Sequence, residues 1–426
     1  MGLEIDAAPD RSPARWRARR PAWLRMPAPV SLAQSQRTLP WRVIFAQAAS
    51  IWLATRIAYA ILTWYLPLAI GGQGPSTHPF SLYTLIRRWT YWDGHAYIVL
   101  AQGGYNHIND TVYFPLFPGL IKIVSTLIGS HWITAALLIS NLAALLAYFG
   151  VAALAAQIAP AGRERRVART AVLLFATYPL GFFLVAAYSD GLFAGLAALT
   201  LLFSMRRDWR WAAAVGILAG LCRPVAPALI LPLAWEALQR YRELRAEMPI
   251  RQALRQMAPA VPAVLGPIIG IGLYACYLWL RFGSPFTFVL AESHWAHFFL
   301  LPLFSIPVAI VGFFGLHAQT TLQMRVFLDL APIVAAVILT FAAIRRAPVA
   351  LTLYMLCLLF LVTSEPIDFT DLFISGGRYM IAAAPLFVIF AGRLARSEWL
   401  LPILLWSGAL LQALLAIYFL QYGWIV

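Results

Sequence analysis

The residues that could do chemistry are few, and the most prominent is Asp93, in the segment WDGH that begins at Trp92. An aspartate in the first turn of a helix is commonly a cap, because the backbone N–H groups there are unpaired. The same helix N-terminus keeps the carboxylate ionised, as a general base requires. Spacing alone therefore leaves two interpretations of Asp93 open, a helix cap and a catalytic base.

Two arginines and a second aspartate stand beside or within apolar runs. Arg223 interrupts such a run, and a charge within a membrane costs about 2.5–3.5 kcal/mol unless it is paired or solvated. It either serves a function or forms a structural ion pair with Asp190, which could itself be a loop cap. Arg378 opens a later run, followed by Tyr379, where a guanidinium could bind a phosphate through two hydrogen bonds or anchor a helix at the membrane interface.

The remaining polar candidates are weaker. His95 could assist the base or contact a donor phosphate. Glu292, His294 and His297 have a spacing that could bind a metal, but the run is aromatic and no further ligand is evident. We therefore predict no cofactor and no metal ligand, and leave a divalent metal open. The acidic segment 365–371 either solvates its loop or shapes an acceptor pocket.

The elements that must position these residues are membrane helices. The chain has 426 residues, of which 62% are hydrophobic and 12% charged, whereas soluble domains are about 45–50% apolar and about 25% charged. Too little polar surface is left to cover a water-soluble globule, so most of the solvent is lipid. The net charge of +15 does not indicate a nucleic-acid partner, because the arginines cluster in short gaps between apolar runs, which is a signal of membrane topology.

The hydropathy pattern predicts an all-α polytopic membrane protein with about eleven transmembrane helices. We place the arginine-rich, disordered tail of residues 1–41 in the cytosol, near anionic lipid, and the single transmembrane domain at residues 42–426. The apolar runs are 42–70, 133–158, 168–187, 191–205, 211–238, 258–280, 298–316, 326–344, 348–362, 379–395 and 399–420.

Two choices complete this topology. The run 211–238 is interpreted as two half-length helices broken at Arg223-Pro224, and the run 298–316 as an interfacial or re-entrant segment. Cytosolic stretches then hold 24 of the 32 basic residues. The longest gap, 71–132, becomes a first external loop with a surface helix whose apolar stripe is Trp92, Ala96 and Val99, ended by Gly103-Gly104.

Several short motifs resemble one known family. WDGHAYIVLAQGGY from Trp92 and YFPLFPGL from Tyr113 are similar to the first external loop of the glycosylphosphatidylinositol mannosyltransferase II family. Further matches follow in the same order: AYSD at 187–190, GLCRP at 220–224, FGSP at 282–285 and SGGRY at 375–379. Members of that family more often carry glutamate where Asp190 stands. The family belongs to the GT-C glycosyltransferases, which use lipid-phosphate sugars.

The resemblance implies a GT-C-like fold and inverting transfer of mannose from a polyprenyl-phosphate-mannose donor, with Asp93 as the base. The acceptor would be a lipid or glycan on the external face of a multi-pass membrane protein, in a bacterial plasma membrane. Our candidates for binding the donor phosphate are Arg378, Arg223, Tyr379 and His95, and those for contacting substrate are Trp92, Tyr97, Tyr188 and Asp190. The alternatives are a multi-pass lipid or solute transporter or flippase, and a scaffold without chemistry.

Overall fold

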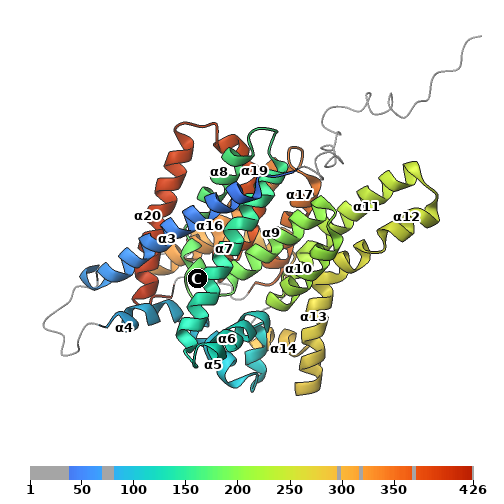
Figure 1. Ribbon diagram of the computed structural model, residues 1–426. Coiled ribbons are helices and arrows are strands. Elements are labelled where there is room, and N and C mark those ends of the chain that lie inside the picture. The colour runs from blue at the N-terminus through green and yellow to red at the C-terminus, as the bar shows by residue number, and fades with distance from the viewer. Residues whose placement is uncertain (1–37, 70–80, 295–298, 316–319, 367–370, 425–426) are drawn as a thin grey trace, which may run out of the picture.

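The computed structural model describes residues 38–69, 81–294, 299–315, 320–366 and 371–424 (Figure 1). Every secondary-structure element in these ranges is an α-helix or a 3-10 helix, which confirms the predicted all-α class. Most of the predicted tail, residues 1–37, lies outside the described residues, and so do residues 70–80 of the predicted loop.

The helices are long and apolar enough to make this an integral, multi-pass membrane protein. Within the described residues, six helical stretches have the length and composition to cross a bilayer. They are Trp41–Pro67, Trp132–Ile158, Ile250–Phe282, Leu322–Ala343, Gly376–Leu394 and Leu400–Leu420. Shorter apolar helices add to them, at Leu116–Leu127, Trp209–Cys222, Phe304–Gly315 and Val349–Ser364.

Most apolar runs of the sequence coincide with helices of the bundle, but the run 168–187 is α-helical only as far as Ala176 and then forms the 3-10 turn η4 (Gly181–Leu184). In chain order the helices are α3 (Trp41–Ala69), α7 (Trp132–Ile158), α8 (Glu164–Ala176), α9 (Asp190–Arg206), α10 (Trp209–Cys222), α11 (Ile230–Glu247), α13 (Ala260–Phe282), α15 (Pro302–Gly315), α16 (Thr320–Ala343), α17 (Val349–Ser364), α19 (Ala384–Leu394) and α20 (Leu400–Leu420).

The predicted break at Arg223-Pro224 is confirmed. Helix α10 ends at Cys222, and the backbone of Arg223 is extended, with φ −154° and ψ 149°. A residue before proline is disfavoured in the α region, which explains why the helix stops there. A 3-10 turn, η5 (Ala226–Leu229), then leads into α11.

Close contacts between glycines bring two helices of the bundle together. Helices α10 and α13 approach at Gly220 and Gly270, where a Cβ on either residue would overlap a backbone carbonyl oxygen of the other helix. Such approach of two backbones is typical of helix pairs in membranes.

The 81–131 segment, described from Ser81 onward, forms short helices at one end of the bundle. They are α4 (Leu82–Arg87), η2 (Arg88–Thr90), α5 (Asp93–Gly103), η3 (Ile108–Val112) and α6 (Leu116–Leu127), and in Figure 1 they lie beside α14 (Thr287–His294). Helix α5 ends at Gly103, as predicted, and Gly104 has a positive φ.

The predicted apolar stripe of this surface helix stays a prediction, except that its first residue lies outside the helix. Trp92 precedes the first turn of α5, and Val99 is half exposed. The face that is buried inside the protein contains Gly94, Tyr97 and Ile98, and α5 packs on α6 and α7.

Candidate active site

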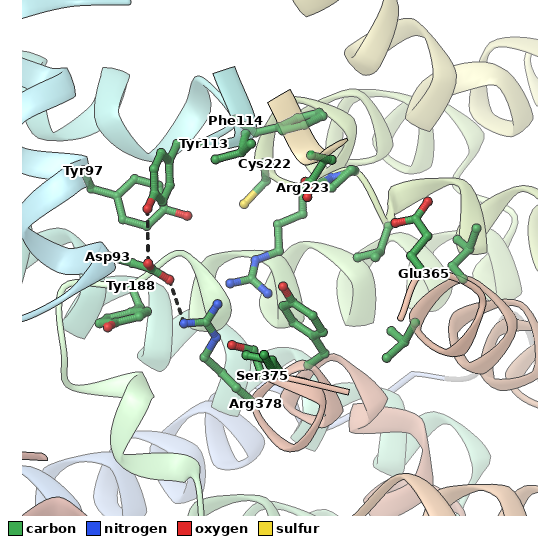
Figure 2. Close-up of a pocket in the computed structure, with 18 of the residues that line it drawn as sticks. Asp93, Tyr97, Tyr113, Phe114, Tyr188, Cys222, Arg223, Glu365, Ser375 and Arg378 are labelled. Atoms are coloured by element: carbon green, nitrogen blue, oxygen red, sulfur yellow. Dashed lines mark hydrogen bonds and ion pairs between the residues drawn. The ribbon is translucent and has the colours of Figure 1, made fainter. Parts of the chain in front are cut away.

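A cavity of about 270 Å³ lies between the short helices of the 81–131 segment and the bundle (Figure 2). Its walls come from segments far apart in the sequence: the start of α5, the Val112–Phe114 segment, the turn between α10 and η5, and the segment that contains Arg378. The polar or aromatic lining residues are Trp92, Asp93, Tyr97, Tyr113, Phe114, Tyr188, Cys222, Arg223, Glu292, Glu365, Ser375, Arg378, Tyr379 and Trp424.

Asp93 is the first residue of α5, but its carboxylate does not cap the helix. Oδ2 pairs with Nη1 of Arg378 at 2.7 Å, and Oδ1 accepts a hydrogen bond from the hydroxyl of Tyr113 at 3.2 Å (Figure 2). The residue before it, Trp92, has φ 58°. Positive φ in a residue other than glycine costs about 1–3 kcal/mol and is found preferentially at functional sites. The geometry therefore departs from the capping interpretation.

Arg378 is 7% exposed and comes from α18 (Gly376–Tyr379), a single helical turn. Its guanidinium lies 5.2 to 5.5 Å from the ring centroids of Phe183, Tyr188 and Tyr379. In addition to the ion pair with Asp93, Nε of Arg378 is 3.9 Å from Oδ1 of Asp190. Aromatic faces and two carboxylates together offset the cost of burying this charge.

Arg223 is the second buried guanidinium of the site, at 8% exposed. Its Nη2 is 2.8 Å from Oδ2 of Asp190, and its Nε donates a hydrogen bond to Oγ of Ser189 at 3.0 Å. The hydroxyl of Tyr97 is hydrogen-bonded to the same serine oxygen at 2.8 Å. The ion pair between Arg223 and Asp190, one of the two alternatives that the sequence left open, is therefore present. Asp190, at 2% exposed, joins the two arginines from behind the cavity wall.

The charges of this cluster balance when both carboxylates are ionised: two arginines face two aspartates. A phosphate that enters between Arg223 and Arg378 would compete with the aspartates for guanidinium hydrogen bonds. Arginine presents its donors in a planar fork that matches phosphate oxygens. The arrangement can therefore bind an anion at the two arginines, in competition with the aspartates.

Two tyrosines of the 81–131 segment keep their phenolic protons across a wide pH range. Burial raises the pKa of Tyr97, and burial and the charge of Asp93 raise the pKa of Tyr113. A phenol whose pKa is raised keeps its proton, so Tyr113 continues to donate to the carboxylate of Asp93.

The far end of the cavity has a different character. Glu365 lies across the cavity from Asp93 in Figure 2, and Glu292 also belongs to the lining. Burial and the nearby charge of Glu365 raise the pKa of Glu292 to about 7. The cavity therefore has a basic end, where the arginines lie, and an acidic end.

Of the predicted site residues, the structure brings together Asp93, Arg378, Arg223, Tyr379, Trp92, Tyr97 and Tyr188 in the cavity lining, with Asp190 directly behind it. It does not bring His95 to them: this side chain is exposed and outside the lining, because residues two apart on a helix point to different sides. We leave it out of the phosphate site.

Sequence reasoning did not select Tyr113, Ser189 or Trp424. The first stands in the YFPLFPGL motif and the second directly before Asp190, so both carried a signal. Trp424 carried no sequence signal. Its ring centroid lies 6.3 Å from that of Trp92, a residue more than 300 positions earlier in the chain.

No group of three histidine, cysteine or acidic side chains that could hold a metal is found among the residues that the structure describes. Of the metal candidates considered from the sequence, His297 lies outside those residues.

No family model matches the sequence, and no curated protein matches it. Among solved structures, the chain is similar to ArnT from Cupriavidus metallidurans bound to undecaprenyl phosphate, at 18% identity and a TM-score of 0.45, over 86% of this chain and 63% of that one. It is also similar to the oligosaccharyltransferase of Archaeoglobus fulgidus in complex with zinc and sulfate, at 14% identity and a TM-score of 0.36, over 86% of this chain and 52% of that one. The chain thus spans less than two thirds of either protein.

Proposed function

We propose that this chain is a membrane glycosyltransferase of the GT-C type, which transfers mannose with inversion from polyprenyl-phosphate-mannose to a hydroxyl group of a lipid or glycan acceptor. The observation that carries the proposal is one cavity in which the carboxylate of Asp93 lies within 2.7 Å of a buried arginine, with a second buried arginine beside it. Group transfer from a phosphate ester needs both parts, a base for the acceptor and cations for the leaving phosphate.

The two arginines serve the leaving group. Arg378 and Arg223 bind the phosphate of the donor, and Tyr379 lies beside both guanidiniums, 5.5 and 5.7 Å from its ring centroid. When the bond between the anomeric carbon and the phosphate oxygen breaks, negative charge grows on that oxygen. Buried cations stabilise this charge more strongly than water-exposed ones, because the surroundings are less polarisable than water.

Asp93 serves the acceptor. Once the donor phosphate occupies Arg378, the carboxylate is free to accept the proton of the acceptor hydroxyl. The acceptor oxygen attacks the anomeric carbon from the side opposite the phosphate, so that one C–O bond forms as the other breaks and the configuration inverts. The proton ends on Asp93, and polyprenyl phosphate leaves with the electron pair.

A lipid-linked donor suits the location of the site. The cavity is bordered by apolar helices that have the composition to lie in a bilayer, so a polyprenyl chain could remain in lipid while its headgroup enters. The topology that we predict from the arginine distribution places this end of the bundle on the external face, with the N-terminus in the cytosol.

The test is direct. Purified protein is incubated with radiolabelled polyprenyl-phosphate-mannose and a membrane lipid extract, and the products are separated by chromatography. We expect the label to move to a new lipid or glycan species and polyprenyl phosphate to accumulate in equal amount. If the donor instead crosses the membrane of a reconstituted vesicle unchanged, the transporter alternative is favoured. If neither a labelled lipid or glycan nor polyprenyl phosphate forms, the proposal is contradicted.

A further inference from the structure

The backbone that carries Arg378 has very little room. Ser375 has φ 66° and is followed by Gly376 and Gly377. A Cβ on Gly377 would overlap the carbonyl oxygen of Leu328 in α16, and a Cβ on Gly376 would lie 2.6 Å from Cδ1 of Ile333 in the same helix. Because a four-residue helix gains little stability from its own hydrogen bonds, contacts from neighbouring elements must fix this turn.

Two such contacts hold the peptide groups on either side of Gly377. The N–H of Gly377 donates to Oδ1 of Asp329 at 2.9 Å, and its carbonyl oxygen accepts from the hydroxyl of Tyr178 at 2.7 Å. Asp329 comes from α16 and Tyr178 from the segment between α8 and η4 (Gly181–Leu184). The residue that precedes Arg378 is thus held from two directions.

The burial of Asp329 calls for a reason. It lies in the apolar stretch Leu322–Ala343 and is 1% exposed. A carboxylate in such surroundings is costly unless strong interactions repay it. The hydrogen bond to Gly377 is one such interaction, since it gives Oδ1 of the buried side chain a backbone N–H as its partner.

We propose that Asp329 and Tyr178 are positioning residues, which fix the peptide groups around Gly377 so that the guanidinium of Arg378 lies where the donor phosphate replaces Asp93 as its partner. This inference rests on the proposed function. Misplacement of a reacting or binding group by about 1 Å can cost about 100-fold in rate. Loss of either contact would let the turn shift and move Arg378 away from the phosphate.

The test compares Asp329→Leu, Asp329→Asn and Tyr178→Phe. Binding of undecaprenyl phosphate to purified protein is measured by titration, which needs no transfer reaction, and donor and acceptor KM are measured in the transfer assay. We expect Asp329→Leu to weaken binding by about tenfold or more. Tyr178→Phe should weaken it by about two- to tenfold, the usual effect of one neutral hydrogen bond. Asp329→Asn keeps an oxygen acceptor for the N–H of Gly377 and should stay within about threefold of wild type.

In the transfer assay, the donor KM should rise in step with the dissociation constant of undecaprenyl phosphate, while the acceptor KM stays unchanged. Thr340→Val is the matched control, because Thr340 is equally buried in α16 and touches neither the cavity nor Gly377. It should bind like wild type.

Three results would overturn the inference: normal binding by a folded Asp329→Leu variant, equal losses in Asp329→Asn and Asp329→Leu, or equal rises of donor and acceptor KM. If Asp329→Leu does not fold, Tyr178→Phe decides, and normal binding by that variant would overturn the inference. A wild-type protein that binds no undecaprenyl phosphate would instead contradict the proposed function, and the positioning role would fall with it.

Discussion

Replacing Arg378 by lysine separates the charge of this residue from its shape. The guanidinium lies 2.7 Å from Asp93 through Nη1 and 3.9 Å from Asp190 through Nε, so it faces two partners in different directions. An ammonium group keeps the charge, but it is a compact point charge on a flexible chain and cannot form the planar fork that matches phosphate oxygens. Arg378→Lys should therefore lose donor binding although its charge is unchanged.

The magnitude follows from the hydrogen bonds at stake. The variant would lose at least one hydrogen bond to a charged group, each of which contributes about 1.5–3 kcal/mol. Since about 1.4 kcal/mol corresponds to a factor of ten, the donor KM should rise by about 10- to 150-fold. Arg223→Lys should be milder, because Asp190 already neutralises that residue at 2.8 Å.

The assay measures the transfer rate as a function of donor concentration for both variants, with a thermal-shift measurement to confirm folding. Arg281→Lys is the control: this arginine hydrogen-bonds to the backbone of Tyr105 outside the cavity, and its replacement should leave donor dependence unchanged. The reasoning would be refuted if Arg378→Lys behaved like wild type while Arg223→Lys lost donor binding, and the two roles would then be exchanged.

Three further predictions concern topology, packing and the base. In intact cells and a cysteine-free background, a cysteine at His95 should react with a membrane-impermeant reagent and one at Arg345 should not; labelling at position 345 would contradict the proposed topology. Gly270→Val should destabilise the fold by about 1–3 kcal/mol, because a Cβ at this position overlaps the carbonyl oxygen of Ile217. Gly272→Val is the control: nothing lies within 4 Å of a Cβ there, so its unfolding temperature should match that of wild type. Tyr113→Phe removes a 3.2 Å hydrogen bond to the base and should lower kcat by about two- to tenfold with donor KM unchanged; a change in donor KM alone would assign this tyrosine to the phosphate.

The helices were predictable because their signals are local. Within a bilayer every backbone polar group must be satisfied inside the protein, so an apolar run of sufficient length becomes a helix. The break at Arg223 was equally local, since proline disfavours the helical conformation of the residue before it. The face that α5 buries, with Gly94, Tyr97 and Ile98, could not be predicted from local signals, because it depends on packing against α6 and α7.

The site shows the same division. Asp190 and Arg223 could be paired from the sequence because two opposite charges in apolar surroundings have few other partners. The pair of Asp93 with Arg378 spans 285 residues, and no spacing rule connects them. Only the fold brings α5 and α18 to the same cavity, and with them the possibility that donor binding releases the base.

The most direct test of the central claim is the turnover of purified Asp93→Asn with polyprenyl-phosphate-mannose as donor. The substitution preserves shape but removes the negative charge, and with it both the ability to accept a proton and the ion pair with Arg378. Titration with undecaprenyl phosphate and thermal unfolding therefore report whether donor binding and folding survive. General-base catalysis contributes about 10²–10⁴-fold, so we expect turnover to fall by at least about 100-fold in a folded protein that still binds undecaprenyl phosphate. Turnover above about a tenth of the wild-type rate would show that Asp93 is not the base.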